Sequence, residues 1–572
     1  MREEPELNPS TTGRSLDSLA VPVRLPFERI LPGPIADYVL LTFGGTWGHE
    51  YLIHTTQLPT SGFHYQEQAG RSCAHLRPYW MLYNRTSGQG LAIALACMGN
   101  WLFELKPEGG TTLLRVRTSP DGIVPFDTLN GLPVPGALVS AFEGHWDYGA
   151  QPIVRFIRQR LLRNLGPDWP LVQYNNWYGY EGTFDEKSLM DSARAAHDIG
   201  CELFTLDAGW YGKGDWSATV GDWTVNNQRF PNGLEAVSKV VHQLGMKFGL
   251  WIEIECAAPD TPVGRAHPDW YLSQGAHRLS DRAVLDFGKP EMLAYARSVI
   301  DRLVKDYGLD YIKMDFNTDT SLDGEKEAAG SDPIYRHLEG LTKLWSYMRT
   351  KYPALIVENC SSGSLRQDVM PAAYTDTHWV SDNVDNRWNL AQNYGATLAF
   401  PPEMCSHWTV TPTRDDSALD LEAQFTANML GHLGLSGHIS RWDAATLRIA
   451  AEKIALYKQI RPIIRKADVY HLTPPISPSA PRSMQVLLYV DSASNSAVLF
   501  VFHGGAPEME HTVKLRGLQG DEKYRVNMPP GFGPTEIRSG KELMEQGLSL
   551  KFPHSGASAV ILLEVLKKAQ RR

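Results

Sequence analysis

Two charged side chains interrupt the apolar run YIKMDF at residues 311–316. The apolar residues suit a buried strand, and Lys313 and Asp315 share one face of it because side chains alternate along a strand. Charged groups are seldom buried unless they pair or take part in chemistry. Two interpretations remain open. One is a Lys–Asp pair that only stabilises packing; the other is a carboxylate that faces a pocket from the end of a strand and is kept ionised by the lysine.

A second group of carboxylates lies in the segment HWVSDNVDNR, residues 378–387. Paired carboxylates can act as acid, base and nucleophile at an acetal carbon. They can also bind a metal, but histidines at metal-ligand spacing do not accompany Asp315 and Asp382. The alternative is that Asp382 or Asp385 caps a helix or pairs with Arg387, and this suits Asp385 better than Asp382. Shared chemistry requires a fold that brings Asp315 and Asp382 together.

The middle of the chain predicts such a fold. Short apolar runs alternate with segments of helical period, such as residues 186–197, 292–305 and 334–351, which is typical of an α/β protein with a (β/α)8 TIM barrel. A doubly wound open sheet is the alternative, but no GxGxxG motif opens the first unit. The eight predicted strands lie near residues 172–177, 203–206, 248–254, 283–287, 311–316, 355–359, 377–380 and 435–439.

Polar or aromatic residues end seven of these runs, at the edge where a barrel places its active site. Asp315 ends the fifth predicted strand and Asp382 the seventh, so both side chains would face the same lumen. This clustering favours a single site at the barrel mouth. The seven residues are Trp177, Asp207, Glu253, Asp286, Asp315, Cys360 and Asp382.

Short alternating runs broken by Gly, Pro and Asn precede and follow the barrel and predict β-sandwiches. The expected organisation is an N-terminal β-sandwich domain at residues 1–160, the catalytic barrel at 161–466 and a small C-terminal β-sandwich domain at 467–572. A helix near residues 152–162 would connect the first two domains.

The composition limits the kinds of molecule that the protein is expected to bind. A net charge of −9 over 572 residues argues against nucleic acid, and the 16 Trp and 23 Tyr slightly favour carbohydrate, which binds flat aromatic faces. The six cysteines are scattered without a CxxC pair, which favours free thiols in a reducing compartment. No signal-peptide segment and no apolar run of about 18 residues is visible, so the sequence predicts a cytoplasmic protein with no membrane partner. No metal or organic cofactor is implied.

At the two carboxylates the sequence resembles glycoside hydrolase family 36, the bacterial-type α-galactosidases of clan D. LDYIKMDFN (309–317) is similar to the family's nucleophile strand, commonly YIKWDMN, and WVSDNVDNRWNLAQNYG (379–395) to its acid/base segment, near WTSDNTD with QYG at fixed spacing. Matches in the same order run from about residue 57 to about residue 470. They include FGLWIEIE (248–255), ENCSSGSLRQD (358–368), PPEMCSH (401–407) and YKQIRPII (457–464).

The resemblance implies double displacement with retention of anomeric configuration, with Asp315 as nucleophile and Asp382 as general acid/base. Lys313 would hold Asp315 ionised and touch the sugar hydroxyls. The other sugar-binding residues implied by the family's motifs are Trp177 and Trp251 as ring-lining tryptophans, Asp207 as the first Asp of DDGW, Asn317 after the nucleophile, and Cys360 and Gly363 next to the C2 substituent.

Two positions depart from the family. Its DDGW is Asp207-Ala208-Gly209-Trp210 here, so Ala208 replaces a carboxylate that binds hydroxyls near C4 and C6. The arginine shortly before the family's LDL strand falls by spacing at Ser280, with Arg278 and Arg282 close by. The sugar that is recognised is therefore less well defined than the reaction.

The leading hypothesis is an exo-acting α-glycosidase that releases terminal α-linked galactose from a glycoside or oligosaccharide. A second hypothesis keeps the mechanism and changes the sugar to an α-N-acetylgalactosaminide, a β-L-arabinopyranoside or a galactoside modified at C4 or C6. A third, from another class, is a catalytically silent sugar-binding protein. A homo-oligomer is compatible with the resemblance.

Overall fold

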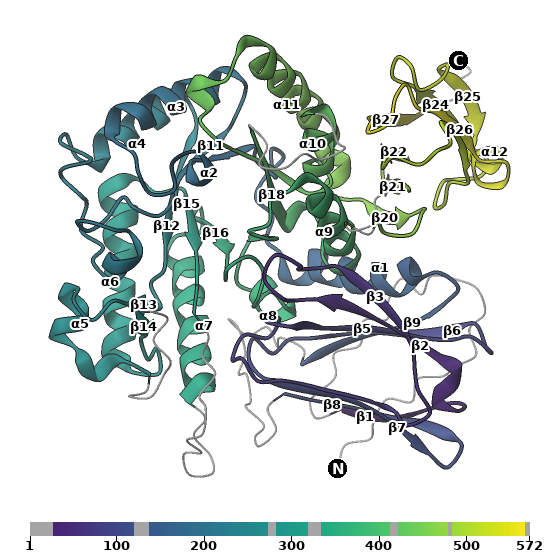
Figure 1. Ribbon diagram of the computed structural model, residues 1–572, viewed down its shortest axis with the longest axis horizontal. Helices are drawn as coiled ribbons and strands as arrows, with labels where there is room; N and C mark the ends of the chain where they lie inside the picture. The colour runs from purple at the N-terminus through teal and green to yellow at the C-terminus, as the bar shows by residue number, and fades with distance from the viewer. Residues whose placement is uncertain are drawn as a thin grey trace, which may run out of the picture.

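The structure is a computed structural model. It describes residues 27–118, 136–272, 282–318, 333–411, 421–476, 478 and 483–566. A central barrel is flanked by the β-rich N-terminal part, coloured purple in Figure 1, and the β-rich C-terminal part, coloured yellow. Within the described ranges, no helix combines the length and the apolar character that crossing a bilayer requires.

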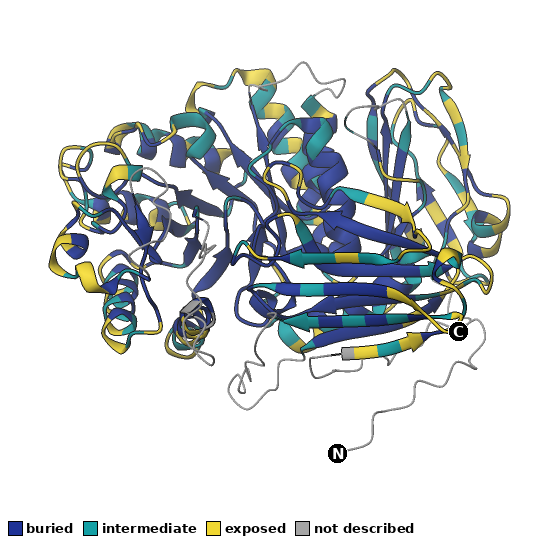
Figure 2. Ribbon diagram, turned by 60° about the horizontal axis from the view of Figure 1, so that its bottom comes forward, coloured by how far each residue is buried: buried dark blue, intermediate teal, exposed yellow. Residues whose placement is uncertain are grey.

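Eight parallel strands close into the barrel that the sequence predicts. The last strand pairs with the first, where Gln173 lies opposite Gly434. Helices cover the outer face and side chains fill the lumen, so the strands are buried, as their dark blue colour shows in Figure 2. The strands are β10 (Gln173–Asn175), β11 (Leu203–Leu206), β12 (Lys247–Ile252), β15 (Tyr311–Met314), β16 (Ile356–Asn359), β17 (Thr377–Trp379), β18 (Cys405–Val410) and β19 (His432–Ser436).

The prediction of a barrel strand at residues 283–287 is wrong. β14 (Ala283–Val284) instead pairs antiparallel with β13 (Cys256–Ala257) outside the barrel. The missed strand is β18, whose sequence CSHWTV intersperses polar residues and lacks the apolar run of a typical buried strand. Asp315 therefore follows the fourth barrel strand rather than the fifth, and Asp382 follows the sixth rather than the seventh. They remain two strands apart, so both can still face the lumen.

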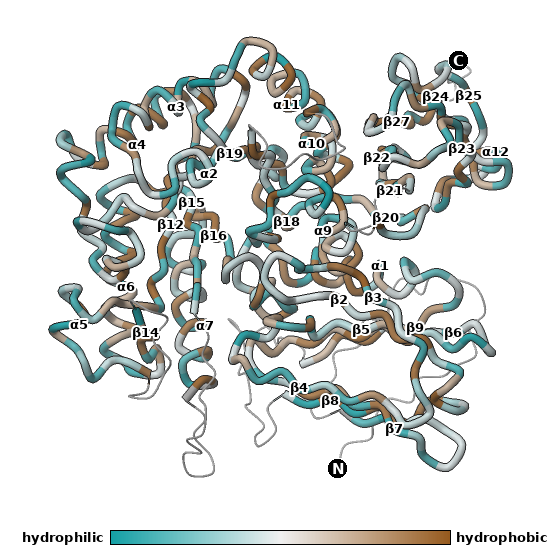
Figure 3. Tube along the Cα trace, in the orientation of Figure 1, coloured by the Kyte–Doolittle hydropathy of each residue, from teal (hydrophilic) through white to brown (hydrophobic). Residues whose placement is uncertain are grey.

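Amphipathic helices surround the barrel, with hydrophobic and hydrophilic residues alternating along them in Figure 3. Asp185 begins the first of them with a capping box, and Gly308, with φ at 60°, ends a later one in the left-handed conformation. The predicted helical segments at 186–197, 292–305 and 334–351 are confirmed. The helices are α3 (Glu186–Asp198), α4 (Leu234–Gln243), α6 (Pro290–Tyr307), α7 (Pro333–Lys351), α9 (Asn386–Ala399), α10 (Leu421–Asn428) and α11 (Ala444–Ile464), with short helices α2 (Trp177–Tyr180), α5 (Pro262–Ala266) and α8 (Val369–Ala372).

Two antiparallel sheets form the N-terminal sandwich. Trp80 lies between them and stacks on Phe103 with ring centroids 4.2 Å apart. The sheet orders are β3 (Ile53–Gln57), β2 (Tyr38–Gly44), β5 (Leu76–Asn84), β6 (Gln89–Leu95), β9 (Ala137–Glu143), and β1 (Phe27–Leu31), β8 (Thr111–Thr118), β7 (Trp101–Glu108), β4 (Phe63–Glu67). Helix α1 (Trp146–Phe156), extended by a π-helical turn, connects this sandwich to the barrel and begins before the predicted residue 152.

The C-terminal part packs a six-stranded antiparallel sheet against a two-stranded one. The larger sheet has the order β20 (Asp468–His471), β21 (Met484–Asp491), β22 (Ser496–His503), β27 (Ser558–Val565), β24 (Lys523–Asn527), β25 (Glu536–Ser539). The smaller pairs β23 (Glu510–Val513) with β26 (Leu548–Lys551), and α12 (Gly540–Glu545) precedes β26.

Buried polar contacts attach the N-terminal sandwich to the barrel. Asp368, at the start of α8, accepts the backbone N–H groups of Cys97 (3.2 Å) and Met98 (2.6 Å) and the hydroxyl of Ser72 (2.5 Å). Such groups cost free energy when they are left unpaired, so they fix one docking arrangement.

Helix α9 approaches the same sandwich through Gly395. A Cβ on this residue would overlap the carbonyl oxygen of Tyr51. We expect Gly395→Ala to lower the free energy of unfolding by about 1–3 kcal/mol through overpacking, although alanine is favoured over glycine inside a helix by about 1 kcal/mol. Urea unfolding measures the change, and Ala455→Gly on the exposed face of α11 isolates the propensity term. Unchanged or higher stability of Gly395→Ala would contradict this packing.

Candidate active site

Asp315 immediately follows β15, and its carboxylate accepts four hydrogen bonds. The indole Nε1 of Trp251 (3.0 Å) and the Nδ2 of Asn317 (2.8 Å) donate to Oδ2. The backbone N–H groups of Phe316 (2.8 Å) and Ser362 (3.2 Å) donate to Oδ1. Donors of this kind favour the ionised form and fix the direction of the carboxylate.

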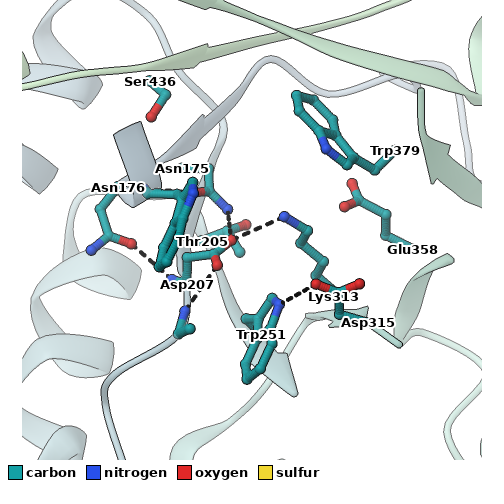
Figure 4. Close-up of polar contacts among 12 residues, drawn as sticks. Asn175, Asn176, Thr205, Asp207, Trp251, Lys313, Asp315, Glu358, Trp379 and Ser436 are labelled. Atoms are coloured by element: carbon teal, nitrogen blue, oxygen red, sulfur yellow. Dashed lines mark hydrogen bonds and ion pairs between the residues drawn. The ribbon is translucent and has the colours of Figure 1, made fainter. Parts of the chain in front are cut away.

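Lys313 lies one pleat before Asp315, and its positive charge acts on the Asp315 carboxyl. Its Nζ is 3.1 Å from Oδ2 of Asp207, as Figure 4 shows, and 4.5 Å from the ring centroid of Trp408. Burial alone would raise the pKa of Asp315, but the charge of Lys313 and the neighbouring side chains of Cys360, Asn317 and Trp251 outweigh it, so this pKa lies below its ordinary value. Burial lowers the pKa of Lys313, but the carboxylate of Asp207, together with the other acidic groups around it, outweighs this effect, so the pKa of Lys313 is raised well above its ordinary value.

Asp207 follows β11 and is held by the neighbouring strand. The Nδ2 of Asn175 donates to its Oδ2 at 2.7 Å, its own backbone N–H donates to Oδ1 of Asn176 at 2.7 Å, and the N–H of Ala208 donates to its Oδ1 at 2.9 Å. Figure 4 shows these contacts beside Lys313 and Trp251. Four of the predicted site residues, Asp207, Trp251, Lys313 and Asp315, therefore converge at the ends of three consecutive barrel strands.

Asp382 lies in the loop after β17 and accepts from two indoles. Nε1 of Trp379 donates to Oδ1 at 2.8 Å and Nε1 of Trp47 donates to Oδ2 at 2.9 Å. The hydroxyl of Tyr178 donates to the backbone carbonyl at 2.6 Å. Burial and then the charge of Asp315 raise the pKa of Asp382, and the two indoles only partly offset this rise. The two acids therefore lie within electrostatic reach, and their pKa values move in opposite directions.

The aromatic residues form a connected wall. Trp216 meets Trp177 edge to face at a centroid distance of 5.4 Å and Trp251 at 5.8 Å. The guanidinium of Arg282 lies 5.3 Å from the ring centroid of Trp216, and its Nε is 3.0 Å from the carboxylate of Glu253. Trp216 was not predicted as a site residue, and Arg282 was named from the sequence only as a neighbour of Ser280. Ser280 and Arg278 lie outside the described residues.

Cys360 and Gly363 follow β16, the strand that pairs with β15 on the side away from β12. The Cys360 thiol is buried, and burial raises its pKa well above the ordinary value, so it is a neutral neighbour of Asp315. Gly363 has φ at 87°, and a Cβ there would overlap Oε1 of Glu50. Glycine is needed at this turn for both reasons.

Several polar groups at the site escaped the sequence-based prediction. Trp47 and Glu50 come from the N-terminal sandwich, where no local motif marks them. Glu358 was not predicted either, whereas Glu253 was predicted at the barrel mouth; both are fully buried, and burial raises the pKa of each to about 7. Asp286, predicted at the barrel mouth, instead accepts the backbone N–H of Gly288 at 2.8 Å outside the barrel.

Asp385 occupies the N-terminal cap position of α9, as the alternative interpretation expected, but its side chain makes no capping hydrogen bond. Among the residues the structure describes, no three His, Cys, Asp or Glu side chains gather as metal ligands. The chemistry available at the barrel mouth is therefore that of its carboxyls: one held ionised, one inclined to keep its proton, and an aromatic wall beside them.

Comparison with known proteins points to the same chemistry. Residues 149–467 match the family described as Melibiase, and residues 484–563 match the glycosyl hydrolase family 36 C-terminal domain. The chain is thus a TIM-barrel glycoside hydrolase of the α-galactosidase type. It belongs to glycoside hydrolase family 36, since the first match spans more than half of its 572 residues.

Individual relatives are similar over most of the chain. Alpha-galactosidase AgaA of Geobacillus stearothermophilus is 27% identical over an alignment of 567 residues, and the match covers 94% of this chain and 75% of that protein. Alpha-galactosidase 1 of Pediococcus pentosaceus is 30% identical over 70% of this chain and 55% of its own length. The crystal structure of AgaA superposes with a TM-score of 0.83 at 25% identity, covering 94% of this chain and 76% of that one. These likenesses support the fold and the family.

Lys313 balances the buried carboxylates, so its removal should destabilise the fold. We expect Lys313→Met to lower the free energy of unfolding at neutral pH by about 3–5 kcal/mol, the cost of leaving a buried charge unpaired. Urea unfolding at neutral and acid pH measures this.

The loss of stability in Lys313→Met should be larger at neutral pH than at acid pH. A carboxyl with a lowered folded-state pKa stabilises the fold above its unfolded pKa, and this stabilisation is lost as pH falls through the folded pKa. Lys313→Met removes that contribution from Asp315, so the difference in the free energy of unfolding between the wild type and the variant should become smaller at acid pH. The double variant Lys313→Met with Asp207→Asn should recover part of the loss. A neutral-pH stability equal to that of the wild type would show that Lys313 does not balance these groups.

Proposed function

We propose that this chain is a retaining exo-α-galactosidase that releases terminal α-linked galactose by double displacement. Asp315 attacks the anomeric carbon while Asp382 protonates the leaving glycosidic oxygen. Asp382 then removes a proton from water, which hydrolyses the glycosyl–aspartate ester. Enzymes of this type hold the two carboxyls roughly 5–5.5 Å apart. The observation that carries the proposal is that Asp315, held by four donors, and Asp382, held by two indoles, follow strands of the same barrel, with their pKa values shifted in opposite directions.

The environments of the two acids suit these roles. Asp315 keeps Oδ1 and Oδ2 oriented through four donors, which orients a nucleophile that must remain ionised. Asp382 is inclined to hold its proton while Asp315 is charged. Forming the ester neutralises Asp315, which lowers the pKa of Asp382 and prepares it to act as a base.

Sugar binding is assigned to the groups beside these acids. Asp207 and Lys313 would bind hydroxyls as a charged pair, and Trp177 and Trp251 would line the ring. Asn317, Cys360 and Gly363 would complete the pocket around the carbon next to the anomeric centre. A variant of AgaA that carries two substitutions has been crystallised with stachyose, which supports an oligosaccharide as the substrate class for this chain as well.

One observation favours a second candidate sugar. Ala208 is 2% exposed and follows Asp207 directly, so no second carboxylate accompanies Asp207 there. Buried hydroxyl recognition depends on such partners. The same mechanism on an α-N-acetylgalactosaminide, a β-L-arabinopyranoside or a C4- or C6-modified galactoside is the alternative. A panel of nitrophenyl glycosides decides, and a clear preference for plain α-galactoside would exclude the alternative.

The roles of the two acids predict different losses. Asp315→Ala should abolish turnover of aryl α-galactosides, because no other group there replaces the nucleophile. Asp382→Asn should lower kcat/KM by about 10²–10⁴-fold on substrates with poor leaving groups, the usual contribution of general acid catalysis, and much less on dinitrophenyl galactoside. Proton NMR of the first product should show the α-anomer.

Asp385→Asn is the matched control, because it alters a carboxylate of the same loop that touches neither acid, and it should retain activity. Circular dichroism verifies the folding of each variant. Full hydrolysis by Asp315→Ala, or a β-anomer as first product, would contradict the proposal.

The pKa shifts also predict the pH profile. The kcat/KM of the free enzyme should rise with ionisation of Asp315 below the ordinary carboxyl range and fall with deprotonation of Asp382 above it. With dinitrophenyl galactoside, Asp382→Asn should lose the falling limb, because no acid is then required. An unchanged falling limb in that variant would assign the limb to another group.

A further inference from the structure

The loop after β2 brings the N-terminal sandwich against the segment that carries Asp382. Besides the indole of Trp47, the backbone carbonyl of Gly48 accepts from Nδ2 of Asn383 at 3.0 Å and from Nε2 of Gln392 at 3.1 Å. The loop therefore contacts Asp382, its neighbour Asn383 and helix α9 at the same time.

Glu50 of this loop is fully buried beneath the acid/base segment. Its Oε2 accepts from the hydroxyl of Ser381 at 2.5 Å and from Nε2 of Gln392 at 3.4 Å. Its Oε1 lies against the backbone of Gly363 and has no hydrogen-bond partner within the described part of the chain. A buried carboxyl with one unpaired oxygen is costly to keep, and the proposed catalytic cycle of Asp315 and Asp382 assigns it no task.

Ser381 connects Glu50 to both sides of Asp382. Its Oγ accepts the backbone N–H of Asn383 at 3.0 Å and Nε2 of Gln392 at 3.0 Å while donating to Glu50. The Ser381 hydroxyl therefore holds Asn383, the residue after Asp382, and its own direction depends on the Glu50 carboxyl. Loss of that acceptor would free the loop in which the acid lies.

Two charged groups face Glu50. Asp382 lies across Ser381, and Arg77 of β5 lies on the other side, with its guanidinium over the ring of Tyr51. The other groups against it, Gly363, Ser381 and Gln392, do not titrate. Burial, with a contribution from Asp382, raises the pKa of Glu50 to about 8, although Ser381 and Arg77 oppose the rise. At neutral pH Glu50 is therefore mostly protonated and adds little negative charge beside Asp382.

We propose that Glu50 is a positioning residue for Asp382: through Ser381 it fixes the orientation of the acid, and its own proton keeps a second negative charge away from that acid at neutral pH. The inference rests on the proposed acid/base role of Asp382. It assigns a function in the reaction to the N-terminal sandwich, which is remote in sequence from the barrel.

The leaving-group dependence of the rate tests this role. Glu50→Ala should lower kcat/KM for a disaccharide or methyl α-galactoside by about 10–10²-fold, because small displacements of a catalytic group cost that much. The same variant should leave kcat/KM for dinitrophenyl galactoside within about twofold, because that leaving group needs no proton. A purely structural role would lower both equally and would overturn the proposal.

Glu50→Gln separates positioning from charge. The amide oxygen can still accept from Ser381, so activity at neutral pH should be recovered. In the wild type, Glu50 stays mostly protonated up to about pH 8, so the neutral amide should leave the falling limb of the pH profile where it lies in the wild type. A limb that moves to lower pH in Glu50→Gln would show that Glu50 is ionised beside Asp382 and would overturn the charge part of the proposal.

The matched control is Glu67→Gln, which alters a buried carboxyl of the same sandwich that contacts His75 and Tyr65 but no residue of the site. It should change neither the leaving-group dependence nor the limb.

An infrared titration without substrate provides an independent readout. The difference between wild type and Glu50→Gln should contain a protonated carboxyl band that disappears above neutral pH. Absence of that band would overturn the inference. Failure of the proposed function would appear differently, as inactivity of the wild type on every α-galactoside, whatever the titration shows.

Discussion

The charge balance around one buried lysine is the constraint on which the site depends. The Nζ of Lys313 lies between the carboxylate of Asp207 and the ring faces of Trp379 and Trp408. Its charge also acts on Asp315. A cation taken out of water is stable only where carboxylates and aromatic faces replace its hydration. Removing any of these partners exposes the desolvation cost of the remaining charges.

The same balance explains why neighbouring carboxyls behave differently. Glu358 lies beside Lys313 in the next strand, but the Lys313 ammonium pairs with Asp207, and the Oε2 of Glu358 accepts from the Tyr311 hydroxyl instead. One lysine cannot neutralise every carboxyl that surrounds it, so burial raises the pKa of Glu358 to about 7 while that of Asp315 falls. Asp382, farther along the barrel mouth, receives indole donors and the repulsion of Asp315, and its pKa rises. Chemically identical groups thereby acquire the different protonation states that acid/base chemistry needs.

Local sequence patterns were enough to predict the barrel and the position of its mouth. The alternation of helical and apolar segments predicted a closed parallel barrel, and polar residues at strand ends predicted its mouth. The pattern failed at β18, a buried barrel strand whose sequence intersperses polar residues, and at residues 283–287, where β14 pairs with β13 outside the barrel. Burial looks alike in one dimension whether a strand lies inside or outside the barrel.

Trp47 and Glu50 could not be predicted for a different reason. Trp47 lies 335 positions from Asp382, and Glu50 lies 331 from Ser381, so only tertiary docking brings them together. Nothing in the run GTWGHE distinguishes a surface turn from a wall of an active site. The motifs predicted Asp315 and Asp382 as site residues, but two of the groups that surround Asp382 come from another part of the chain.

The N-terminal sandwich is consequently part of the site rather than an attachment to it. Without it, Asp382 would keep the Trp379 indole but lose that of Trp47, and Ser381 would lose its carboxyl acceptor. The contacts that hold the sandwich in place, such as those of Asp368 with Ser72 and the backbone of Met98, are polar and buried, so a shifted docking would leave several of them unpaired. The way in which the sandwich docks therefore determines which groups surround Asp382. Apolar residues could stabilise such an interface equally well, so the polar contacts are better explained by selection for catalysis.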